Sequence, residues 1–334
     1  MNMACRPLLR RTLLTGVAGL GCWFTIGPAR AQALDALVPA ARKEGRVMAY
    51  SVIDPTLMQK VIAAFQQRYG VAVDQQRMLT NPLGQRLEAE SKAQQTVADL
   101  FITTDPLFIR DAAAQGWVAP VETIPGVDTF PAEVRTQYSI VVGHVPYSLV
   151  WNTKRAKAPP HAWPDLAASQ WQGARMMIDP RVGGVSPLSW YVLMRQTYGD
   201  GFITEIGKGT RYTPSVVPGL QQIAAGAMAV YAPGIHQVFV GLAAKSAPIQ
   251  EAFPNPTISS DNIMALLAHA PHPNAARLFA GFLMSREGQS LLNMDGFSPL
   301  PNVPGTRPLP QLARIAPETV NPQLPQISAL LGLG

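Results

Sequence analysis

The chain has 334 residues, a formal net charge of +6 and two cysteines. That length suffices for one large domain or two ordinary ones, and 14% charged against 47% hydrophobic residues excludes extended disorder. Four arginines and no acidic residue fall in residues 1–31, so removing their charges leaves +2 for the remaining chain. A nearly neutral chain without a Lys/Arg cluster is not a nucleic-acid binder. Cys5 and Cys22 lie in the same segment, which excludes disulfides and thiol chemistry from the rest.

Residues 1–31 have the three parts of an export signal. A basic segment ends at Arg11, an apolar stretch interrupted by glycines covers 12–26, and Ala29-Arg30-Ala31 fits the small-x-small pattern of a signal-peptidase site. We therefore expect a signal peptide that is cleaved near Ala31. The Arg10-Arg11 pair resembles a twin-arginine signal, and an ordinary Sec signal is the alternative. The apolar stretch is too short and too rich in glycine for a membrane-spanning helix.

The next part of the chain alternates short apolar strands with amphipathic helices. The pattern predicts strands at 46–50, from 71 and at 99–103, and helices over 34–44, 56–69 and 83–94. Gly45 and Gly70 each follow a helix, as glycine commonly does, and Asn81-Pro82 is typical of a helix start. A β-α-β-α-β unit of this kind has parallel strands. Ligands then gather at the carboxyl ends of the strands.

The second half repeats this pattern. It predicts strands at 140–142, 148–151, 174–178, 227–231 and 263–268, and helices over 186–198, 220–225, 274–284 and 285–294. The last 35 residues are rich in proline and are expected to lie along the surface. Two α/β halves without a flexible linker between them indicate two lobes with a cleft.

Several polar side chains are placed at this cleft by the pattern. The candidates that follow a strand of the first half are Ser51, Asp54, Thr80, Asn81, Thr104 and Asp105. A second group of candidates includes Ser186 and the residues before it, at the helix that begins at Ser186-Pro187, where Ser186 could be the N-cap. Gly183 and Gly184 allow backbone N–H groups to approach a ligand, and the helix N-terminus carries partial positive charge. Arg181 could pair with a carboxylate or phosphonate. A plain loop before a capped helix is the alternative.

Six segments, in order along the chain, carry a family resemblance. They are Ala40–Ser51, Ala98–Asp105, Pro146–Lys154, Ala162–Leu166 with Trp171–Gly173, Ala270–Phe279 and Phe282–Gln289. Together they resemble the extracellular solute-binding proteins of ABC importers, in the branch that contains the bacterial ferric-ion-binding proteins. The resemblance covers nearly the whole chain after residue 31.

The resemblance implies an α/β, type II periplasmic binding protein fold. Two α/β lobes are joined by crossing strands, with a ligand cleft between them. We expect residues 32–142 plus 263–334 to form lobe 1 and residues 143–262 to form lobe 2. The crossing segment then brings His144 and Tyr147 to the cleft floor as further candidates, although a lone histidine is more often an ordinary hydrogen-bonded residue.

The resemblance also raises the question of a metal. Ferric-ion-binding members supply a neighbouring pair of tyrosines, whereas the matching stretch here, Val230–Gln237, has no such pair. His236 falls at or beside one tyrosine position, Asp54 replaces the family's first ligand, and Thr104 or Asp105 replaces its acidic one. We therefore expect no metal and no cofactor, and keep ferric ion with a synergistic anion as the alternative.

The expected function is that of the periplasmic solute-binding component of an ABC importer. The small-molecule ligand is expected to be an organic anion, such as a carboxylate, a phosphonate or a sugar phosphate. The expected partner is an ABC permease in the inner membrane, and the protein is expected to be a monomer that binds no nucleic acid. A periplasmic enzyme is disfavoured, because the sequence has no G-x-S-x-G, H-E-x-x-H or phosphate-loop motif. A solute sensor would look the same in sequence.

Overall fold

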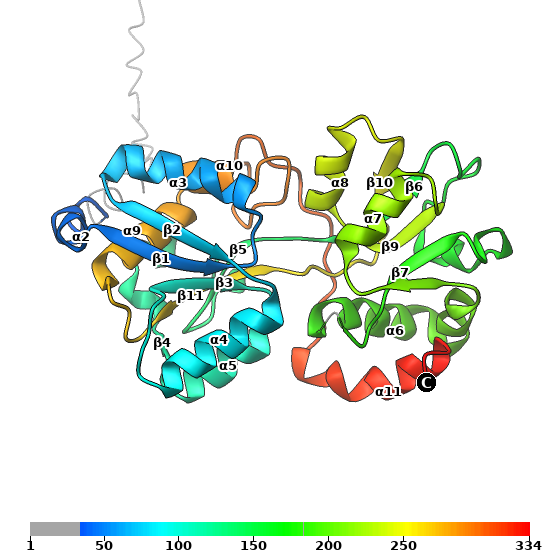
Figure 1. Ribbon diagram of the computed structural model, residues 1–334, viewed down its shortest axis with the longest axis horizontal. Coiled ribbons are helices and arrows are strands. Elements are labelled where there is room, and N and C mark those ends of the chain that lie inside the picture. The colour runs from blue at the N-terminus through cyan, green and yellow to red at the C-terminus, as the bar shows by residue number, and fades with distance from the viewer. Residues whose placement is uncertain (1–33, 183) are drawn as a thin grey trace, which may run out of the picture.

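Two α/β lobes make up the computed structural model, which describes residues 34–334 except residue 183 (Figure 1). Each lobe is built around its own β-sheet. The expected signal peptide and its cleavage site lie outside the described residues. None of the helices in the described ranges is long and apolar enough to cross a membrane.

The first lobe contains a sheet with strand order β2-β1-β3-β11-β4, in which β5 also pairs with β11. Its strands are β1 (Arg46–Ser51), β2 (Ala72–Arg77), β3 (Leu100–Thr103), β4 (Val118–Ala119), β5 (Ile140–Gly143) and β11 (Asn262–Leu267). As predicted, β1 is parallel to β2 and β3. Strand β11 runs antiparallel to β3, β4 and β5. The carboxyl ends of β2 and β3 therefore lie at one edge of the sheet.

Helices cover both faces of this sheet. They are α2 (Val38–Glu44), α3 (Pro55–Tyr69), α4 (Thr80–Lys92), α5 (Pro106–Ala114), α9 (Pro273–Met284) and α10 (Arg286–Leu292), with 3₁₀ turns η1 (Val121–Thr123), η2 (Val127–Thr129) and η3 (Ala132–Val134). On one face, Phe65 of α3 packs against Phe279 of α9, with ring centroids 4.9 Å apart. On the other, Leu83 and Leu87 of α4 are buried. The predicted helix–strand alternation is thus explained by two apolar layers around one sheet.

The second lobe contains a sheet with strand order β10-β6-β9-β7-β8. Its strands are β6 (Tyr147–Asn152), β7 (Arg175–Ile178), β8 (Arg211–Thr213), β9 (Val230–Ile235) and β10 (Ile249–Ala252). Its helices are α6 (Val185–Gly207), α7 (Val216–Ala224), α8 (His236–Ala243) and α11 (Leu324–Leu330), with 3₁₀ turns η4 (Trp163–Ala167), η5 (Ser169–Trp171), η6 (Pro317–Thr319) and η7 (Asn321–Gln323). Trp163 and Trp190 meet edge to face in the core, with centroids 5.1 Å apart.

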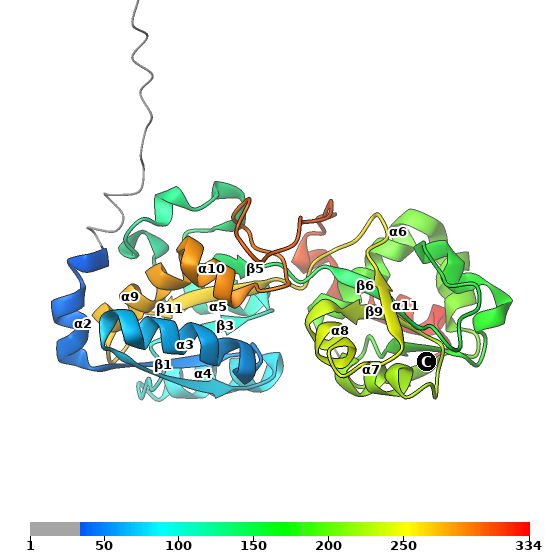
Figure 2. The same cartoon turned by 90° about the horizontal axis from the view of Figure 1, so that it is seen from above.

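Three chain segments connect the lobes (Figure 2). Two are the expected crossings, from β5 to β6 and from β10 to β11, and they are joined by an isolated bridge between Pro146 and Ser259. The third was not predicted. It leads from α10 to the C-terminal helix and pairs with the second crossing where Ala313 N donates to Thr257 O at 2.7 Å.

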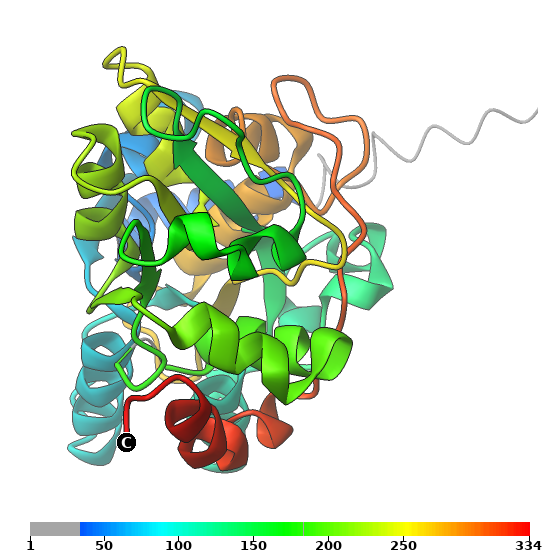
Figure 3. The ribbon, with the colours of Figure 1, turned by 90° about the vertical axis from the view of Figure 1, so that its right-hand side faces the viewer.

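The expected assignment of residues 263–334 to lobe 1 is wrong for the C-terminal helix. Val320, Ile327 and Leu331 are buried in the core of lobe 2, and α11 packs along α6 (Figure 3). The proline-rich composition of the tail concealed these apolar side chains. Burial of the three provides the hydrophobic free energy that holds the chain end on the second lobe.

Two helix starts differ from the expected ones. Helix α4 begins at Thr80 with Leu79 at the N-cap position, so Asn81 lies in its first turn and is not the cap. Helix α6 begins at Val185 with Gly184 at the N-cap position, so Ser186 is not the cap either. Both helices begin without a hydrogen bond from a capping side chain, which leaves their first N–H groups available to another acceptor.

Candidate functional site

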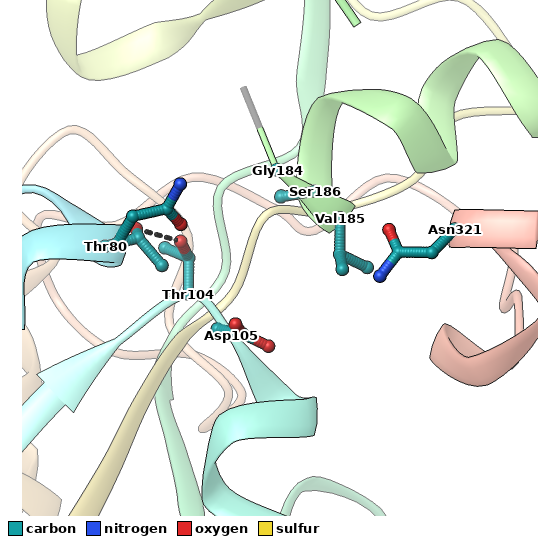
Figure 4. Close-up of a pocket in the computed structure, with 8 residues that line it drawn as sticks. Thr80, Thr104, Asp105, Gly184, Val185, Ser186 and Asn321 are labelled. Atoms are coloured by element: carbon teal, nitrogen blue, oxygen red, sulfur yellow. Dashed lines mark hydrogen bonds between the residues drawn. The ribbon is translucent and has the colours of Figure 1, made fainter. Parts of the chain in front are cut away.

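A cavity of about 160 Å³ lies between the two lobes (Figure 4). Its lining residues are Thr80, Asn81, Thr104, Asp105, Gly184, Val185, Ser186 and Asn321. The first four come from lobe 1, the next three from the start of α6, and the last from the C-terminal segment. A cavity lined from both lobes is the arrangement in which closure can enclose a ligand.

The lobe 1 wall is built from the segments that follow β2 and β3. Thr80 and Thr104 lie side by side there, and their hydroxyl oxygens are hydrogen-bonded at 2.8 Å (Figure 4). One hydroxyl donates to the other, so a single hydroxyl hydrogen of the pair remains for a ligand. The bond also joins the beginning of α4 to the loop before α5.

Asp105 is the acidic residue of the lining and caps α5. Its Oδ1 accepts from the backbone N of Leu107 at 2.9 Å and of Phe108 at 3.2 Å. The N-terminus of α5 is thereby satisfied within the protein. The second carboxylate oxygen makes no hydrogen bond to the described residues, so it is an acceptor without a donor at the edge of the cavity.

The lobe 2 wall depends on the backbone of Gly184. Its φ of 76° and ψ of −165° fall in a region that essentially only glycine occupies. This turn directs the N-terminus of α6 at the cavity. A Cβ on Gly184 would lie 3.8 Å from Oδ1 of Asn81, so the starts of α6 and α4 approach each other across the cavity from opposite lobes.

Electrostatically, the two helix starts bring partial positive charge to the cavity, and the carboxylate of Asp105 brings negative charge. A helix N-terminus carries roughly half a positive charge, and its free N–H groups donate to anions. Helices α4 and α6 both lack a side-chain cap, and both begin in the lining. Among the described residues, the lining contains no lysine or arginine, so its donors are backbone N–H groups, hydroxyls and the side-chain amides of Asn81 and Asn321.

Tyr147 does not line the cavity but contacts Ser186 of the lobe 2 wall. Its hydroxyl lies 3.1 Å from Oγ of Ser186, and only 2% of the residue is exposed. Burial raises the pKa of Tyr147 to about 12, against the opposing effect of hydrogen bonds to Ser186 and Ser260. The side chain is therefore a neutral phenol at physiological pH, and its hydroxyl is hydrogen-bonded to Ser186.

Three predicted residues are not brought to the cavity. Ser51 is fully buried, and its Oγ accepts from Ile53 N at 3.0 Å. Asp54 caps α3 by accepting from Thr56 N at 2.8 Å. Arg181 pairs with Asp179 at 2.8 Å and donates to Leu333 O at 2.7 Å. Each polar group is satisfied by neighbours nearby in the chain or, for Arg181, by the C-terminal segment.

The two candidate histidines lie elsewhere as well. His144 lies in the first crossing, and its Nδ1 is 2.8 Å from Oδ1 of Asp261 in the second crossing. His236 is 1% exposed, and its Nδ1 lies 2.6 Å from Glu251 Oε2 while its Nε2 lies 2.5 Å from Asp295 O. Both rings have structural partners and neither lines the cavity. Gly183, the remaining candidate, lies outside the described residues.

The residues considered for ferric ion are not assembled. Of Asp54, Asp105, His236 and Tyr147, only Asp105 lines the cavity. Over the described residues, 34–182 and 184–334, no group of three or more His, Cys, Asp and Glu side chains is placed to hold a metal ion. Among the described residues, the lining of the cavity combines neutral donors with one carboxylate, that of Asp105.

Two lining residues were missed by sequence reasoning. Val185 directly follows the glycines and could have been inferred from them. Asn321 lies in η7 of the proline-rich tail, more than 130 positions from the nearest other lining residue. Its contribution follows from the third crossing, for which the sequence contains no local signal.

Comparison with known proteins identifies relatives of the chain. The profile of the family described as bacterial extracellular solute-binding protein matches residues 46–298. No curated protein sequence matches the chain.

Solved structures match most of the chain. The periplasmic binding protein AfuA from Actinobacillus pleuropneumoniae, with exogenous fructose-6-phosphate bound, is 19% identical with a TM-score of 0.69 over 87% of this chain and 99% of AfuA. The substrate-binding protein of an Agrobacterium tumefaciens ABC transporter is 17% identical with a TM-score of 0.74, over 86% and 94%. Iron-bound HitA from Pseudomonas aeruginosa is 16% identical with a TM-score of 0.69, over 86% and 98%. These likenesses confirm the expected α/β, type II periplasmic binding fold.

Proposed function

Since the chain belongs to the family of bacterial extracellular solute-binding proteins, we propose that it is the periplasmic component of an ABC importer and that its solute is a small organic anion. The solute is held in the cavity between the lobes. Its class is a carboxylate, a phosphonate or a sugar phosphate.

The observation that carries this proposal is the pair of uncapped helix N-termini. Helices α4 and α6 come from different lobes, begin at the same cavity and have no side chain on their first N–H groups. An anion there receives hydrogen bonds from both lobes and lies at the positive ends of two helix dipoles. It therefore favours the closed arrangement of the lobes, as a transported solute should.

The size and chemistry of the cavity agree with the smaller solutes of this class. Its volume is about 160 Å³, and cavities of about 150 Å³ hold a molecule the size of benzene. Hydroxyls of Thr80 or Thr104 and of Ser186 add neutral donors. One relative of similar fold was solved with a sugar phosphate, an organic anion of the proposed kind.

Ferric ion with a synergistic anion is the second candidate, because HitA is an iron-bound protein of similar fold. Among the described residues, the lining offers one carboxylate and no phenol, and the hydroxyl of Tyr147 is hydrogen-bonded to Ser186. A hard trivalent cation requires several anionic oxygen ligands. We therefore favour the anion without the metal.

The remaining proposals concern the cell. The protein is exported to the periplasm after cleavage of the signal peptide, works as a monomer and delivers its solute to an inner-membrane permease. We propose a binding protein and not an enzyme. A sensor partner in place of a permease would use the same cavity.

A thermal-shift screen of the purified protein tests the proposed function. The panel contains carboxylates, phosphonates, sugar phosphates, polyamines and ferric citrate. A ligand at 100 times its dissociation constant adds about 2.7 kcal/mol to the free energy of unfolding. We expect a shift of several degrees with one class of organic anion. A shift with ferric salts alone, accompanied by a visible charge-transfer band, would instead establish the second candidate.

A further inference from the structure

The carboxylate of Asp105 is a negative charge in a cavity to which two helix starts bring positive charge. Among the described residues, the other lining side chains are neutral. Asp105 also forms no ion pair with any lysine, arginine or histidine of the described ranges, 34–182 and 184–334. This charge repels a simple anion placed beside it, so its presence in the lining requires an explanation.

Capping of α5 accounts for one oxygen of Asp105. Oδ1 accepts from the backbone N of Leu107 at 2.9 Å and of Phe108 at 3.2 Å. The other oxygen, Oδ2, makes no hydrogen bond to the described residues. It is therefore open to a donor that the protein itself does not provide.

Asp54 provides a comparison within the same lobe. It caps α3 in the same way, by accepting from Thr56 N at 2.8 Å, but it is exposed and does not line the cavity, so water solvates its charge. Asp105 is half-buried and lines the space between the lobes. Closure around a solute removes water from its free oxygen, and a carboxylate that loses water without gaining a partner is costly. The solute is the available source of that partner.

Asp105 lies close to the start of α4. The hydroxyl oxygens of Thr104 and Thr80 are 2.8 Å apart, Thr80 is the first residue of α4, and Asp105 directly follows Thr104, at a Cα separation of about 3.8 Å. Figure 4 shows Asp105 on the same wall of the cavity as the two threonines. A solute whose anionic group lies at the start of α4 therefore reaches Asp105 through a short spacer.

Three kinds of substituent on that spacer would meet Asp105 differently. An apolar group provides neither a donor nor a charge. A hydroxyl provides one donor but leaves the negative charge uncompensated. An ammonium provides a charge-assisted hydrogen bond, which is roughly twice as strong as a neutral one, and its positive charge offsets the repulsion between the carboxylate and the anionic group of the solute.

We propose that Asp105 is an ammonium subsite and that the solute is a compact zwitterion. Its carboxylate or phosphonate lies at the starts of α4 and α6, and its ammonium group lies at Asp105. The cavity of about 160 Å³ restricts it to a few carbon atoms, since cavities of about 150 Å³ hold a molecule the size of benzene. This inference rests on the proposed function and adds to it the substrate class and a specificity-determining residue.

Titration calorimetry with matched anions tests the subsite. Propionate, 3-hydroxypropionate and β-alanine carry hydrogen, hydroxyl and ammonium at the same carbon, and ethylphosphonate, 2-hydroxyethylphosphonate and 2-aminoethylphosphonate form the equivalent set. A hydrogen bond to a charged group changes an affinity by about tenfold or more. The ammonium member of at least one set should therefore bind about tenfold more tightly than the hydrogen member, with the hydroxyl member between them. The set with the tighter binding identifies the anionic group.

Asp105→Asn removes the charge and keeps a residue that caps helices well. It should reduce the ammonium preference to about threefold or less and should strengthen binding of the hydrogen member, because the repulsion is gone. Asp54→Asn is the matched control, since it makes the same change at the cap of α3, outside the lining, and should keep the wild-type preference. Asp105→Ser is a second neutral cap for the case that the asparagine variant does not fold, which melting temperatures without ligand establish.

The outcomes separate the two proposals. If the wild-type protein binds no organic anion, with or without an ammonium group, the proposed function fails and this inference falls with it. If it binds an anion but prefers the hydroxyl or hydrogen member, or if the neutral variants of Asp105 keep the ammonium preference, the ammonium subsite is wrong and the proposed function stands.

Discussion

At the scale of single residues, Gly184 has the greatest influence on the site. Its φ of 76° and ψ of −165° direct the first turn of α6 at the cavity, and a side chain at this position is incompatible with that backbone. An added Cβ would lie 3.8 Å from Oδ1 of Asn81, which is an ordinary van der Waals contact. A glycine is therefore required here by its conformation and not by lack of space.

Substituting Gly184→Ala should therefore lower the free energy of unfolding by about 1–3 kcal/mol. It should also weaken solute binding, because the N–H groups of Val185 and Ser186 move. Urea denaturation and titration calorimetry measure the two effects.

A matched control is Gly241→Ala in α8, where an added Cβ meets nothing within 4 Å. Gly241 lies in a helix, so alanine there should raise stability by up to about 1 kcal/mol. Equal effects of the two substitutions would contradict the role assigned to the Gly184 backbone.

Tyr147 leads to a prediction about pH. Burial raises its pKa from the ordinary value of 10.0 to about 12. Because the folded pKa lies above the unfolded one, the contribution of Tyr147 to stability is complete below about pH 10 and is lost as the pH rises toward about 12. The loss of stability between about pH 9 and about pH 11 should be smaller in Tyr147→Phe than in the wild-type protein. Urea midpoints at the two pH values test this, and an identical loss in both proteins would refute it.

The sequence located those site residues that lie at the ends of strands and helices, and misplaced those that were chosen for their side-chain chemistry. Thr104, Asp105 and Ser186 follow strands or begin helices, and topology alone determines where such residues lie. Arg181 and His236 were chosen for their chemistry. Their partners, Leu333 and Asp295 among them, are distant in sequence, and a linear pattern contains no information about them.

At the scale of elements, the beginnings of α4 and α6 determine what the cavity can bind. Neither helix has an acidic residue in its first turn or a capping side chain, whereas α3 and α5 are capped by Asp54 and Asp105. Helices α4 and α6 thus lack a stabilising side-chain cap, and a bound anion can supply the missing acceptor.

Asn81→Asp separates stability from binding at this place. A negative charge in the first turn of α4 should raise the free energy of unfolding by about 0.3–1 kcal/mol. The same charge should weaken binding of an organic anion by about tenfold, and more at low ionic strength. Calorimetric titrations at two salt concentrations, with melting temperatures, measure both effects. Binding that is as strong as wild type would mean that the anion does not lie at α4.

The sequence predicted the elements of the first lobe well and the helix starts less well. The hydrophobic period and the terminal glycines locate α3 and its neighbouring strands. The caps were misplaced because Asn81 and Ser186 are typical capping residues, yet here each side chain faces the cavity within the first turn. Capping propensity and exposure to a ligand favour the same residue types.

At the scale of the whole molecule, the third crossing changes how the lobes are connected. The chain leaves lobe 1 after α10, runs through residues 312–323 and ends on lobe 2. Composition indicated only a surface tail, because three buried apolar residues are few among many prolines. The two expected crossings were predicted from the resemblance to the solute-binding proteins, whereas nothing in the sequence indicated the third.

Ile327→Ala tests the role of the tail. Ile327 is fully buried in the lobe 2 core, so the truncation should cost about 2–5 kcal/mol of stability. Leu309→Ala, at a position 42% exposed, should cost little. Urea denaturation compares the two variants. If both substitutions had similarly small effects, the tail would not be an integral part of lobe 2.

The most direct measurement is a crystal structure with the solute identified by the thermal-shift screen. We predict an organic anion between the lobes, with anionic oxygens about 2.7–3.2 Å from backbone N atoms at the starts of both α4 and α6. An anion bound to only one lobe, or a metal ion coordinated in its place, would contradict the proposed anion site.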